Sequence, residues 1–250
     1  MALQEEFKTQ GDFLFKNRSY LPLIILVIGL LVFIYQKHYN TVATGNWLPE
    51  FYYYICLGIS LFGLYIRVVT VGYTPKNTSG RNTKEGQIAE ELNTTGIYSI
   101  VRHPLYLGNF FMWLGVAMLT ENTWFVIAFI LFYAFYYERI MYAEESFLRQ
   151  KFGNTYLDWA KNTPAFMPSF KYYQKAKYPF SIKKALKKEK NGLAAVFLLF
   201  WAFNFIGEMI KLQAIRFEYD FWFYGALVSS IIYIVLKIMK KQKLLDEINR

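Results

Sequence analysis

The apolar residues of this 250-residue chain fall into long runs that are separated by lysine-rich polar stretches. An apolar run of about 20 residues is long enough, as a helix, to cross the hydrocarbon core of a bilayer. Amphipathic soluble helices would instead interrupt the apolar residues every three or four positions. The pattern predicts an all-α, polytopic integral membrane protein with about six transmembrane helices. These helices are expected at residues 20–36, 51–73, 104–119, 123–137, 193–214 and 221–237.

The polar stretches divide the chain into four parts. Residues 1–19 mix acidic and basic side chains and are expected to form a cytoplasmic lead-in. Residues 20–170 would form the membrane core, followed by a basic interfacial segment at 171–192. Aromatic residues alternate with lysines in that segment, which suits either attachment to an anionic leaflet or ordinary juxtamembrane charge. Residues 193–250 would add two further helices and a basic tail, for which the sequence indicates no role.

The net charge of +10 would suit a nucleic-acid ligand if it were gathered on one surface. It is instead concentrated in alternate loops, so we expect no nucleic acid as a partner. Four of the 28 Lys and Arg residues lie outside the segments on the side of the termini: Lys37, Arg67, Lys211 and Arg216. The positive-inside rule then predicts that both termini and the loops at 74–103 and 138–192 are cytoplasmic.

Metal and disulfide chemistry have few candidate ligands in this chain. Cys56 is the single cysteine and lies in an apolar run, so neither a disulfide framework nor a thiolate metal site is expected. His38 and His103 are the two histidines, which argues against a zinc or di-iron centre. We therefore expect no bound metal.

The stretch at residues 95–109, TGIYSIVRHPLYLGN, places Arg102, His103 and two tyrosines where a polar segment turns into an apolar helix. Pro104 suits the first position of that helix. Ionisable groups at a membrane boundary are unfavourable unless they line a polar cavity or contact a ligand. The cluster is therefore a candidate functional site.

The third and fourth predicted helices are joined by a short turn near Glu121, so they should form an antiparallel hairpin. His103 and Arg139 are equally distant in sequence from this turn and should lie at the same depth. The fourth helix keeps its helical pattern beyond residue 137, so Glu144 and Glu145 should lie about a turn and a half further out. Basic, aromatic and acidic groups are thus predicted to converge at the cytoplasmic surface.

Such a cavity suits a cofactor that carries a carboxylate, an ammonium and a positive sulfonium. Arginine can hold a carboxylate, carboxylates can hold an ammonium or a ribose, and aromatic faces attract a sulfonium. S-adenosylmethionine has all of these groups. The alternative is that Glu144, Glu145 and their basic neighbours only solvate an exposed helix end.

Two groups of residues, in order, resemble one family of membrane enzymes. GIYSIVRHPLYLG begins at Gly96, and the pair Glu144-Glu145 is followed by FGxxY and then by TPxFxP. Over residues 96–168 these elements resemble the isoprenylcysteine carboxyl methyltransferase and phospholipid methyltransferase family. The resemblance implies an integral membrane methyltransferase in which a helical hairpin core carries a cytoplasmic S-adenosylmethionine pocket, without a Rossmann domain.

The resemblance also implies roles for six residues. The cofactor-binding turn would comprise Arg102, His103, Tyr106 and Gly108. The acidic pair that contacts the cofactor would be Glu144 and Glu145. Arg102 and His103 are also the candidate catalytic residues, because an amine acceptor must lose a proton and His103 or a glutamate could take it. A phosphate or carboxylate acceptor is already anionic and needs no base.

The methyl acceptor is expected to be a membrane lipid at the inner leaflet. The segments NTSGRNT and LNTTGIYSIVRHPLYLGN, with the long basic loop, look most like the bacterial branch of the family that methylates lipid A on its 1-phosphate. That resemblance implies the bacterial inner membrane. Phosphatidylethanolamine N-methylation is the next candidate. O-methylation of a protein isoprenylcysteine would require a prenylated partner, and nothing in the sequence indicates one.

Two interpretations from other classes remain open. Membrane sterol and steroid reductases, which bind NADPH, carry a similar RHPxYxG turn that is usually followed by an acidic residue. Here Asn109 follows Gly108, and the Glu144-Glu145 pair with FGxxY fits methyltransferases better. A non-catalytic membrane protein would show no particular link between residues 102–108 and 144–145.

Two groups of polar residues lie inside the predicted helices. Arg67 interrupts the second helix and is expected to extend its charged end to the inner face of the membrane. Asn204, Glu208 and Lys211 share one face of the fifth helix near its outer end, where we expect an interfacial ion pair.

Overall fold

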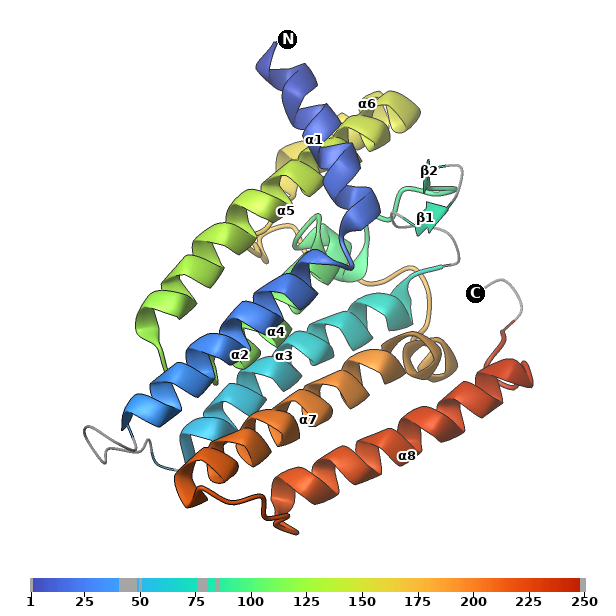
Figure 1. The fold of residues 1–250 in the computed structure, drawn as a ribbon. Helices are drawn as coiled ribbons and strands as arrows, with labels where there is room; N and C mark the ends of the chain where they lie inside the picture. Colours follow the sequence, from blue (N-terminus) through green and yellow to red (C-terminus); the bar gives the residue numbers. More distant parts are fainter. Residues whose placement is uncertain (1, 41–48, 50, 76–80, 84–85, 248–250) are drawn as a thin grey trace.

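The computed structural model describes residues 2–40, 49, 51–75, 81–83 and 86–247, and within them the chain is mainly helical (Figure 1). The helices are α1 (Leu3–Asn17), α2 (Leu21–Tyr39), α3 (Phe51–Tyr73), α4 (Pro104–Met118), α5 (Thr123–Phe152), α6 (Asn154–Asn162), α7 (Ile182–Leu212) and α8 (Phe221–Lys241). A short 3-10 helix, η2 (Gly96–Ser99), precedes α4. Strands β1 (Arg81–Thr83) and β2 (Gly86–Ile88) form a small antiparallel pair that the sequence did not indicate. The predicted all-α polytopic fold is confirmed.

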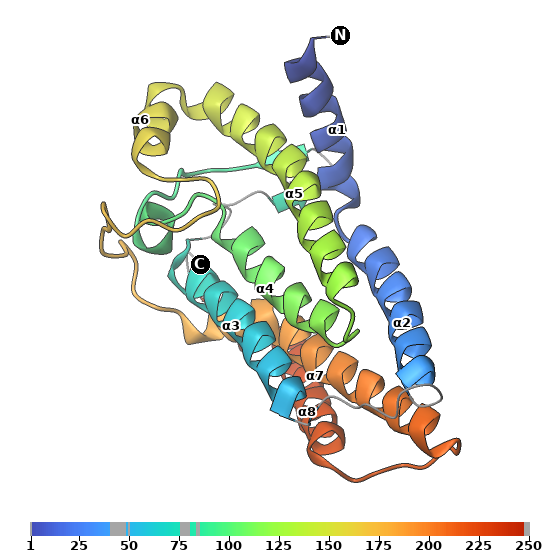
Figure 2. The same cartoon turned by 90° about the vertical axis from the view of Figure 1, so that its left-hand side faces the viewer.

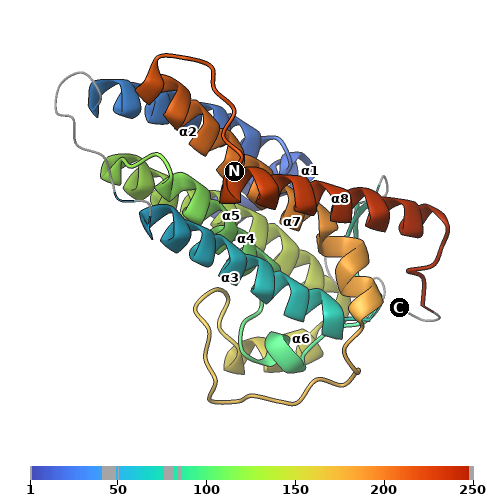
Figure 3. The same ribbon diagram turned by 90° about the horizontal axis from the view of Figure 1, so that it is seen from below.

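Among the described residues, five helices are long and apolar enough to cross a membrane: α2 from Pro22, α3, α5, α7 and α8. Each corresponds to one of the predicted transmembrane helices. The sixth, α4, is apolar but has only 15 residues, which is about 22 Å of helix at ~1.5 Å per residue. Its length is set by Pro104 at its start and by the turn before α5, where the Asn122 side chain accepts a hydrogen bond of 2.9 Å from Phe125 N. It lies inside the bundle, where α3, α5 and α7 contact it (Figure 3).

Helices α3 and α4 approach closely because small residues line their contact. A Cβ on Gly63 would lie 2.5 Å from Met112 N, and a Cβ on Gly108 would lie 2.6 Å from Arg67 Cγ. Ser60 Oγ also donates a hydrogen bond of 2.9 Å to the Met112 carbonyl. Small residues are the usual means by which helices in a membrane come into van der Waals contact. This contact fixes α4 and the turn before it against α3.

The prediction that the fourth helix continues past residue 137 is confirmed, because α5 runs to Phe152. Its far half packs against α1, as Figure 2 shows, and the chain changes direction between α1 and α2 (Figure 1). Gly11 permits this contact, since a Cβ there would lie 2.8 Å from Ala143 Cβ. Phe15 is buried in the same contact. The lead-in segment is therefore a helix that supports the end of α5.

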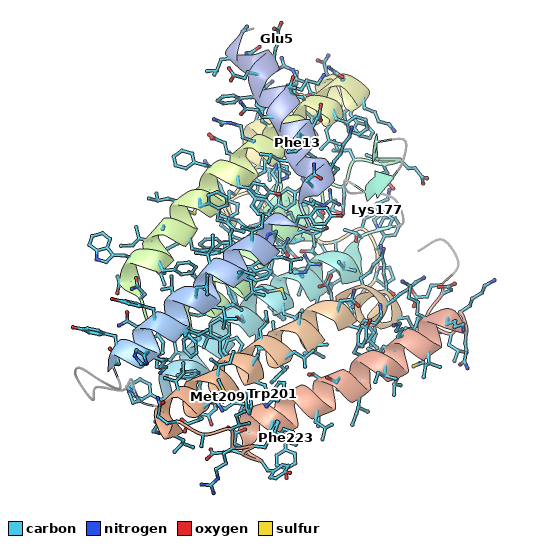
Figure 4. All side chains as sticks on the ribbon, in the orientation of Figure 1. Glu5, Phe13, Lys177, Trp201, Met209 and Phe223 are labelled. Atoms are coloured by element: carbon cyan, nitrogen blue, oxygen red, sulfur yellow. The ribbon has the colours of Figure 1, made fainter. Side chains whose placement is uncertain are left out.

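Helix α7 begins at Ile182, so most of the lysine-rich run lies in its first turns and not in a segment separate from the fifth transmembrane helix. Lysine, alanine, leucine and glutamate favour helix, and the Ser181 side chain caps it by accepting a hydrogen bond of 3.0 Å from Lys184 N. Figure 4 shows Lys177 toward the end where this helix starts, and Phe223 at the opposite end, near the α7–α8 connection.

The polar residues near the other end of α7 are paired. Lys211 Nζ lies 3.4 Å from Glu208 Oε1, so the predicted ion pair at this position is confirmed. Asn204 does not join it, because its amide donates a hydrogen bond of 2.8 Å to Asp220 Oδ2, at the start of α8. The hydrogen bond between Asn204 and Asp220 connects α7 to α8. This end of α7 is distant in sequence from the candidate site.

Candidate functional site

The turn that carries Arg102 and His103 is held by the segment between α6 and α7. Arg102 N donates a hydrogen bond of 2.9 Å to the Pro164 carbonyl, and His103 N donates one of 3.2 Å to the Ala165 carbonyl. Further along, Gly96 N donates a hydrogen bond of 2.9 Å to the Gln174 carbonyl. Two segments about 70 residues apart are thus paired at the cytoplasmic end predicted for α4.

Five of the six predicted site residues lie in direct contact. Glu145 Oε1 accepts a hydrogen bond of 2.9 Å from Arg102 Nε and lies 2.9 Å from His103 Nε2. Glu144 Oε2 accepts a hydrogen bond of 2.8 Å from the Tyr106 hydroxyl and lies 3.5 Å from His103 Nδ1. The hairpin geometry proposed from the sequence therefore brings these two carboxylates to the start of α4.

His103 lies between two acids in a buried position, since 5% of it is exposed. Burial lowers the pKa of an imidazole, but the hydrogen bonds and charges of Glu144 and Glu145 outweigh that effect and raise the pKa of His103 to about 8. At neutral pH the imidazole is therefore mostly protonated, and both ring nitrogens can donate to carboxylates. A charged His103 is not available as a general base.

Arg102 connects the carboxylates to α6. Its Nη1 donates hydrogen bonds of 2.9 Å to the Ala160 carbonyl and 3.0 Å to the Thr163 carbonyl. Tyr156, from the FGxxY motif, is buried beside the same group of residues, and burial together with the charge of Glu145 raises the pKa of its hydroxyl. The acidic pair is thus enclosed by the loop that follows α5 as well as by α4.

A polar pocket of about 320 Å³ opens beside this cluster. Arg102, His103, Tyr106 and Glu144 lie in its wall, and the remaining lining residues come from the α1–α2 junction, α3, α4 and α5. Those that sequence analysis did not assign to the site include Arg18, Arg67, Tyr98, Asn109, Trp113 and Tyr137. The pocket is lined mainly by charged and hydrogen-bonding groups, so it suits a polar ligand.

A much larger apolar groove, of about 1520 Å³, lies on the other side of the hairpin. It is bounded by α3, α4, α5 and the segment between α6 and α7, and its walls are mainly aromatic and aliphatic, among them Phe62, Phe110, Phe111, Phe166 and Phe170. Tyr137 borders both this groove and the polar pocket. An apolar ligand in the groove and a polar ligand in the pocket would therefore lie close to the same tyrosine.

Gly108 is the predicted site residue that the structure places apart from the carboxylates. It faces α3, where its lack of a side chain makes room for the Gly63 carbonyl and the Arg67 stem. Its neighbour Asn109 lines the polar pocket instead. Gly108 therefore supports the site through helix packing.

Arg67, expected from the sequence to extend its charged end to the inner face of the membrane, is paired with residues of α7 and α4. Its Nε lies 2.7 Å from Glu189 Oε2, and its Nη1 donates a hydrogen bond of 2.6 Å to Asn109 Oδ1. A partner inside the bundle is available, so the guanidinium stays there. The charge inside an apolar run was the available signal, but the partner on α7 could not be found from spacing.

The described parts of the chain contain no group of three or more His, Cys, Asp or Glu residues that could hold a metal ion. The carboxylates of the site are engaged by arginine, histidine and tyrosine. The donor set of the pocket therefore fits an organic ligand with charged groups.

Comparisons with known proteins agree with the location of this site. A family profile described as phospholipid methyltransferase matches residues 53–155, which run from α3 to just beyond α5. The matched region includes the turn at Arg102 and His103 and the pair Glu144-Glu145. No solved structure matches the chain.

Three curated proteins are similar over part of their length. The nickel-cobalt-cadmium resistance protein NccN of Alcaligenes xylosoxydans xylosoxydans is 35% identical over 89 residues, which are 36% of this chain and 41% of NccN. Protein-S-isoprenylcysteine O-methyltransferase B of Arabidopsis thaliana is 40% identical over 80 residues, 31% of this chain and 40% of that protein. The protein-S-isoprenylcysteine O-methyltransferase of Schizosaccharomyces pombe is 32% identical over 125 residues, 49% of this chain and 52% of that protein.

This chain thus spans about half, or less, of the length of these relatives. The matched profile region, residues 53–155, contains the hairpin, the carboxylate pair and part of the walls of the two cavities. This part of the chain is similar to the phospholipid methyltransferase family, and the chain is also similar to isoprenylcysteine methyltransferases.

Proposed function

We propose that this protein transfers the methyl group of S-adenosylmethionine to an anionic oxygen of a membrane lipid. The observation that carries the proposal is that Tyr137 lines both the apolar groove and the polar pocket, whose wall also contains His103 and Glu144. A water-soluble cofactor suits the pocket and an acyl chain suits the groove. The match of residues 53–155 to the phospholipid methyltransferase profile supports the reaction class.

The residues of the pocket fit the proposed cofactor. Glu144 would hold its ammonium or ribose hydroxyls, while Glu145, behind the wall, fixes Arg102 and His103. Arg102 would hold its carboxylate, because Nη2 of Arg102 has no partner among the described residues. Tyr106 and Tyr137, whose ring centroids are 4.8 Å apart, offer aromatic faces to a sulfonium. When bound, S-adenosylmethionine supplies an electrophilic methyl group.

The contribution of the protein to such a reaction is position and the exclusion of water. The Tyr106 hydroxyl fixes the rotamer of Glu144, and Arg102 with His103 fixes that of Glu145. Residues held in this way present their charges to a ligand without rearrangement. The aromatic walls of the groove keep bulk water from an anionic acceptor and so preserve its reactivity.

The protonation of His103 bears on the acceptor. An amine acceptor must lose a proton, and an imidazole that is mostly protonated at neutral pH is a poor group to take it. An acceptor that is already anionic needs no base. We therefore favour O-methylation, with a lipid phosphate such as the 1-phosphate of lipid A ahead of N-methylation of phosphatidylethanolamine. The relatives from Arabidopsis and S. pombe are named for isoprenylcysteine, whose carboxylate is also anionic.

We further propose that the polar end of the bundle faces the cytoplasm of a bacterial inner membrane, with both termini on that side. The distribution of lysine and arginine supports this orientation. The cofactor would then reach the pocket from the cytoplasm. A lipid would enter the groove from the inner leaflet.

The experiment that tests the proposal is calorimetry on the purified protein in detergent, with S-adenosylmethionine and NADPH as ligands. We expect binding of S-adenosylmethionine and none of NADPH. The reverse result would identify a reductase. Mass spectrometry of membrane lipids from cells with and without the gene should then show one lipid class shifted by the mass of a CH₂ group. An unchanged lipid profile together with a methylated protein would make a protein the acceptor.

A further inference from the structure

Arg67 and Glu189 form a paired contact inside the helix bundle. Arg67 Nε lies 2.7 Å from Glu189 Oε2, and Arg67 Nη2 lies 2.9 Å from Glu189 Oε1. Two parallel N–H···O bonds of this kind fix both the position and the plane of a guanidinium. The side chain of Glu189 is 6% exposed and that of Arg67 is 22% exposed, so the acid is enclosed while the arginine keeps an open edge.

That open edge lies in the wall of the polar pocket. Arginine has five N–H donors, and hydrogen bonds to Glu189 and Asn109 occupy three of them within the described residues. Glu189 holds the Nε side of the guanidinium and Asn109 holds Nη1. Donors on Nη1 and Nη2 therefore remain for a ligand.

The charge of the pocket favours an anion. Its wall contains three arginines, the mostly protonated His103 and one carboxylate, Glu144. Glu145 and Glu189 lie behind two of the arginines and balance part of this charge. Counting these partners, the site still carries an excess of positive charge, which an anionic ligand group would neutralise.

A buried ion pair is costly to form in a membrane helix bundle and is often replaceable by apolar residues. Glu189 comes from α7, which lies outside the region that matches the family profile. The chain thus uses a helix beyond the common core to hold one arginine of the pocket. This gives α7 a part in the site, for which the sequence indicated none.

We propose that Arg67 binds an anionic group of a ligand in the polar pocket and that Glu189 is the residue that positions it. The anion would be either the carboxylate of the cofactor or the phosphate of a lipid acceptor. The identification of these ligands rests on the proposed function. The presence of an anion-binding site at Arg67 is independent of it.

The test compares the wild-type protein with Arg67→Gln, Glu189→Gln and the control Glu208→Gln. The control changes the same residue type on the same helix, in an ion pair at its other end. Calorimetry in detergent would use two probes, S-adenosylmethionine and dioctanoyl phosphatidic acid. We expect Arg67→Gln to weaken one of them by roughly 10- to 100-fold. Glu189→Gln should weaken the same probe less, and Glu189→Asp should recover part of the loss.

The probe that is affected identifies the anion. Weaker S-adenosylmethionine binding would point to the cofactor carboxylate, and weaker phosphatidic acid binding to a lipid phosphate. A wild-type protein that binds only phosphatidic acid, in a manner that depends on Arg67, would refute the proposed function and leave the anion site standing. Wild-type affinity for both probes in folded Arg67→Gln, or no binding of either by the wild-type protein, would overturn this inference.

A charge swap separates binding from folding. The double variant Arg67→Glu with Glu189→Arg restores an ion pair but removes the arginine from its place in the pocket wall. We expect its thermal stability to exceed that of either single variant while the affected probe stays weakly bound. Recovery of binding in the swap would show that Arg67 acts only through folding. If the swap does not fold, Arg67→Lys provides the test, because it keeps the charge but loses the paired hydrogen bonds. This variant should bind the affected probe with intermediate affinity. Wild-type affinity in Arg67→Lys would count against a role for the paired geometry that Glu189 provides.

Discussion

The Tyr106 hydroxyl donates a hydrogen bond of 2.8 Å to Glu144 Oε2 and so joins the first turn of α4 to a residue 38 positions further along the chain. Glu144 is buried and Tyr106 is half-buried, and both residues line the polar pocket. A buried carboxylate must have such partners. The bond therefore fixes the acid on which the proposed cofactor site depends.

Replacing Tyr106 by Phe should weaken S-adenosylmethionine binding by roughly tenfold, because one hydrogen bond to a charged group contributes about 1.5 kcal/mol or more. The ring and its contact with Tyr137 remain, so the fold should be kept. Calorimetry measures the affinity and circular dichroism the fold. Tyr172→Phe, at an exposed tyrosine, is the matched control and should bind normally. Equal affinity in both variants would separate Tyr106 from the cofactor.

Much of this site could be predicted from the sequence, because it depends on local rules. The apolar runs gave the helices, and the position of the turn near Glu121 gave the depth at which His103 meets the far part of α5. A hairpin leaves little freedom in that alignment. For this reason the sequence predicts that Arg102, His103, Tyr106, Glu144 and Glu145 lie close together.

The rest of the pocket depends on packing between distant segments. Glu189 meets Arg67 across 122 residues, and Arg18 reaches the pocket from the α1–α2 junction. Neither approach follows from periodicity, because each depends on how whole helices pack. The same dependence on helix packing explains the position of Gly108, which the motif alone does not predict. Its place in the motif suggested ligand contact, whereas the glycine is needed for the approach of α3.

The pKa of His103, raised to about 8 by Glu144 and Glu145, predicts a dependence of stability on pH. In the unfolded chain the pKa is about 6.5. The folded protein therefore binds the proton more tightly, and this stabilisation is complete below about pH 6.5 and is lost as the pH rises through about 8. The difference corresponds to about 2 kcal/mol.

Thermal unfolding in detergent at pH 6 and pH 9 measures this effect. His103→Gln, which can still donate a hydrogen bond but does not titrate, should lose less stability than the wild-type protein over that range. His38→Gln should lose as much as the wild-type protein. Parallel profiles for His103→Gln and the wild-type protein would mean that the pKa of His103 is the same in the folded and unfolded states, and a role as base would then be open again.

The contact between α3 and α4 should be sensitive to a single methyl group. In Gly63→Ala the new Cβ would lie 2.5 Å from Met112 N, so the helices must separate, at a cost of about 1–3 kcal/mol. A Cβ on Gly58, on the same helix, would have no neighbouring atom within 4 Å. Gly58→Ala should therefore leave the stability unchanged or raise it slightly. Thermal unfolding compares the two. If both alanines behave alike, the helices are not held at the distance described.

Lys37 and Glu121 form the buried ion pair at the opposite end of the bundle. The Lys37 Nζ lies 2.5 Å from Glu121 Oε1, the side chains are 4% and 2% exposed, and the Tyr53 hydroxyl donates a hydrogen bond of 3.0 Å to the same oxygen. The pair holds the end of α2 against the turn between α4 and α5. Removing either partner leaves the other charge buried.

Lys37→Met and Glu121→Gln should therefore each destabilise the protein by about 3–5 kcal/mol. The double variant should lose less than the sum of the two, because it leaves no isolated charge. Lys211→Met and Glu208→Gln, in the more exposed pair on α7, should change stability by about 1 kcal/mol or less. Unfolding in detergent measures the stability of each variant. If the variants at Lys37 and Glu121 lose no more stability than those at Lys211 and Glu208, water reaches the Lys37–Glu121 pair.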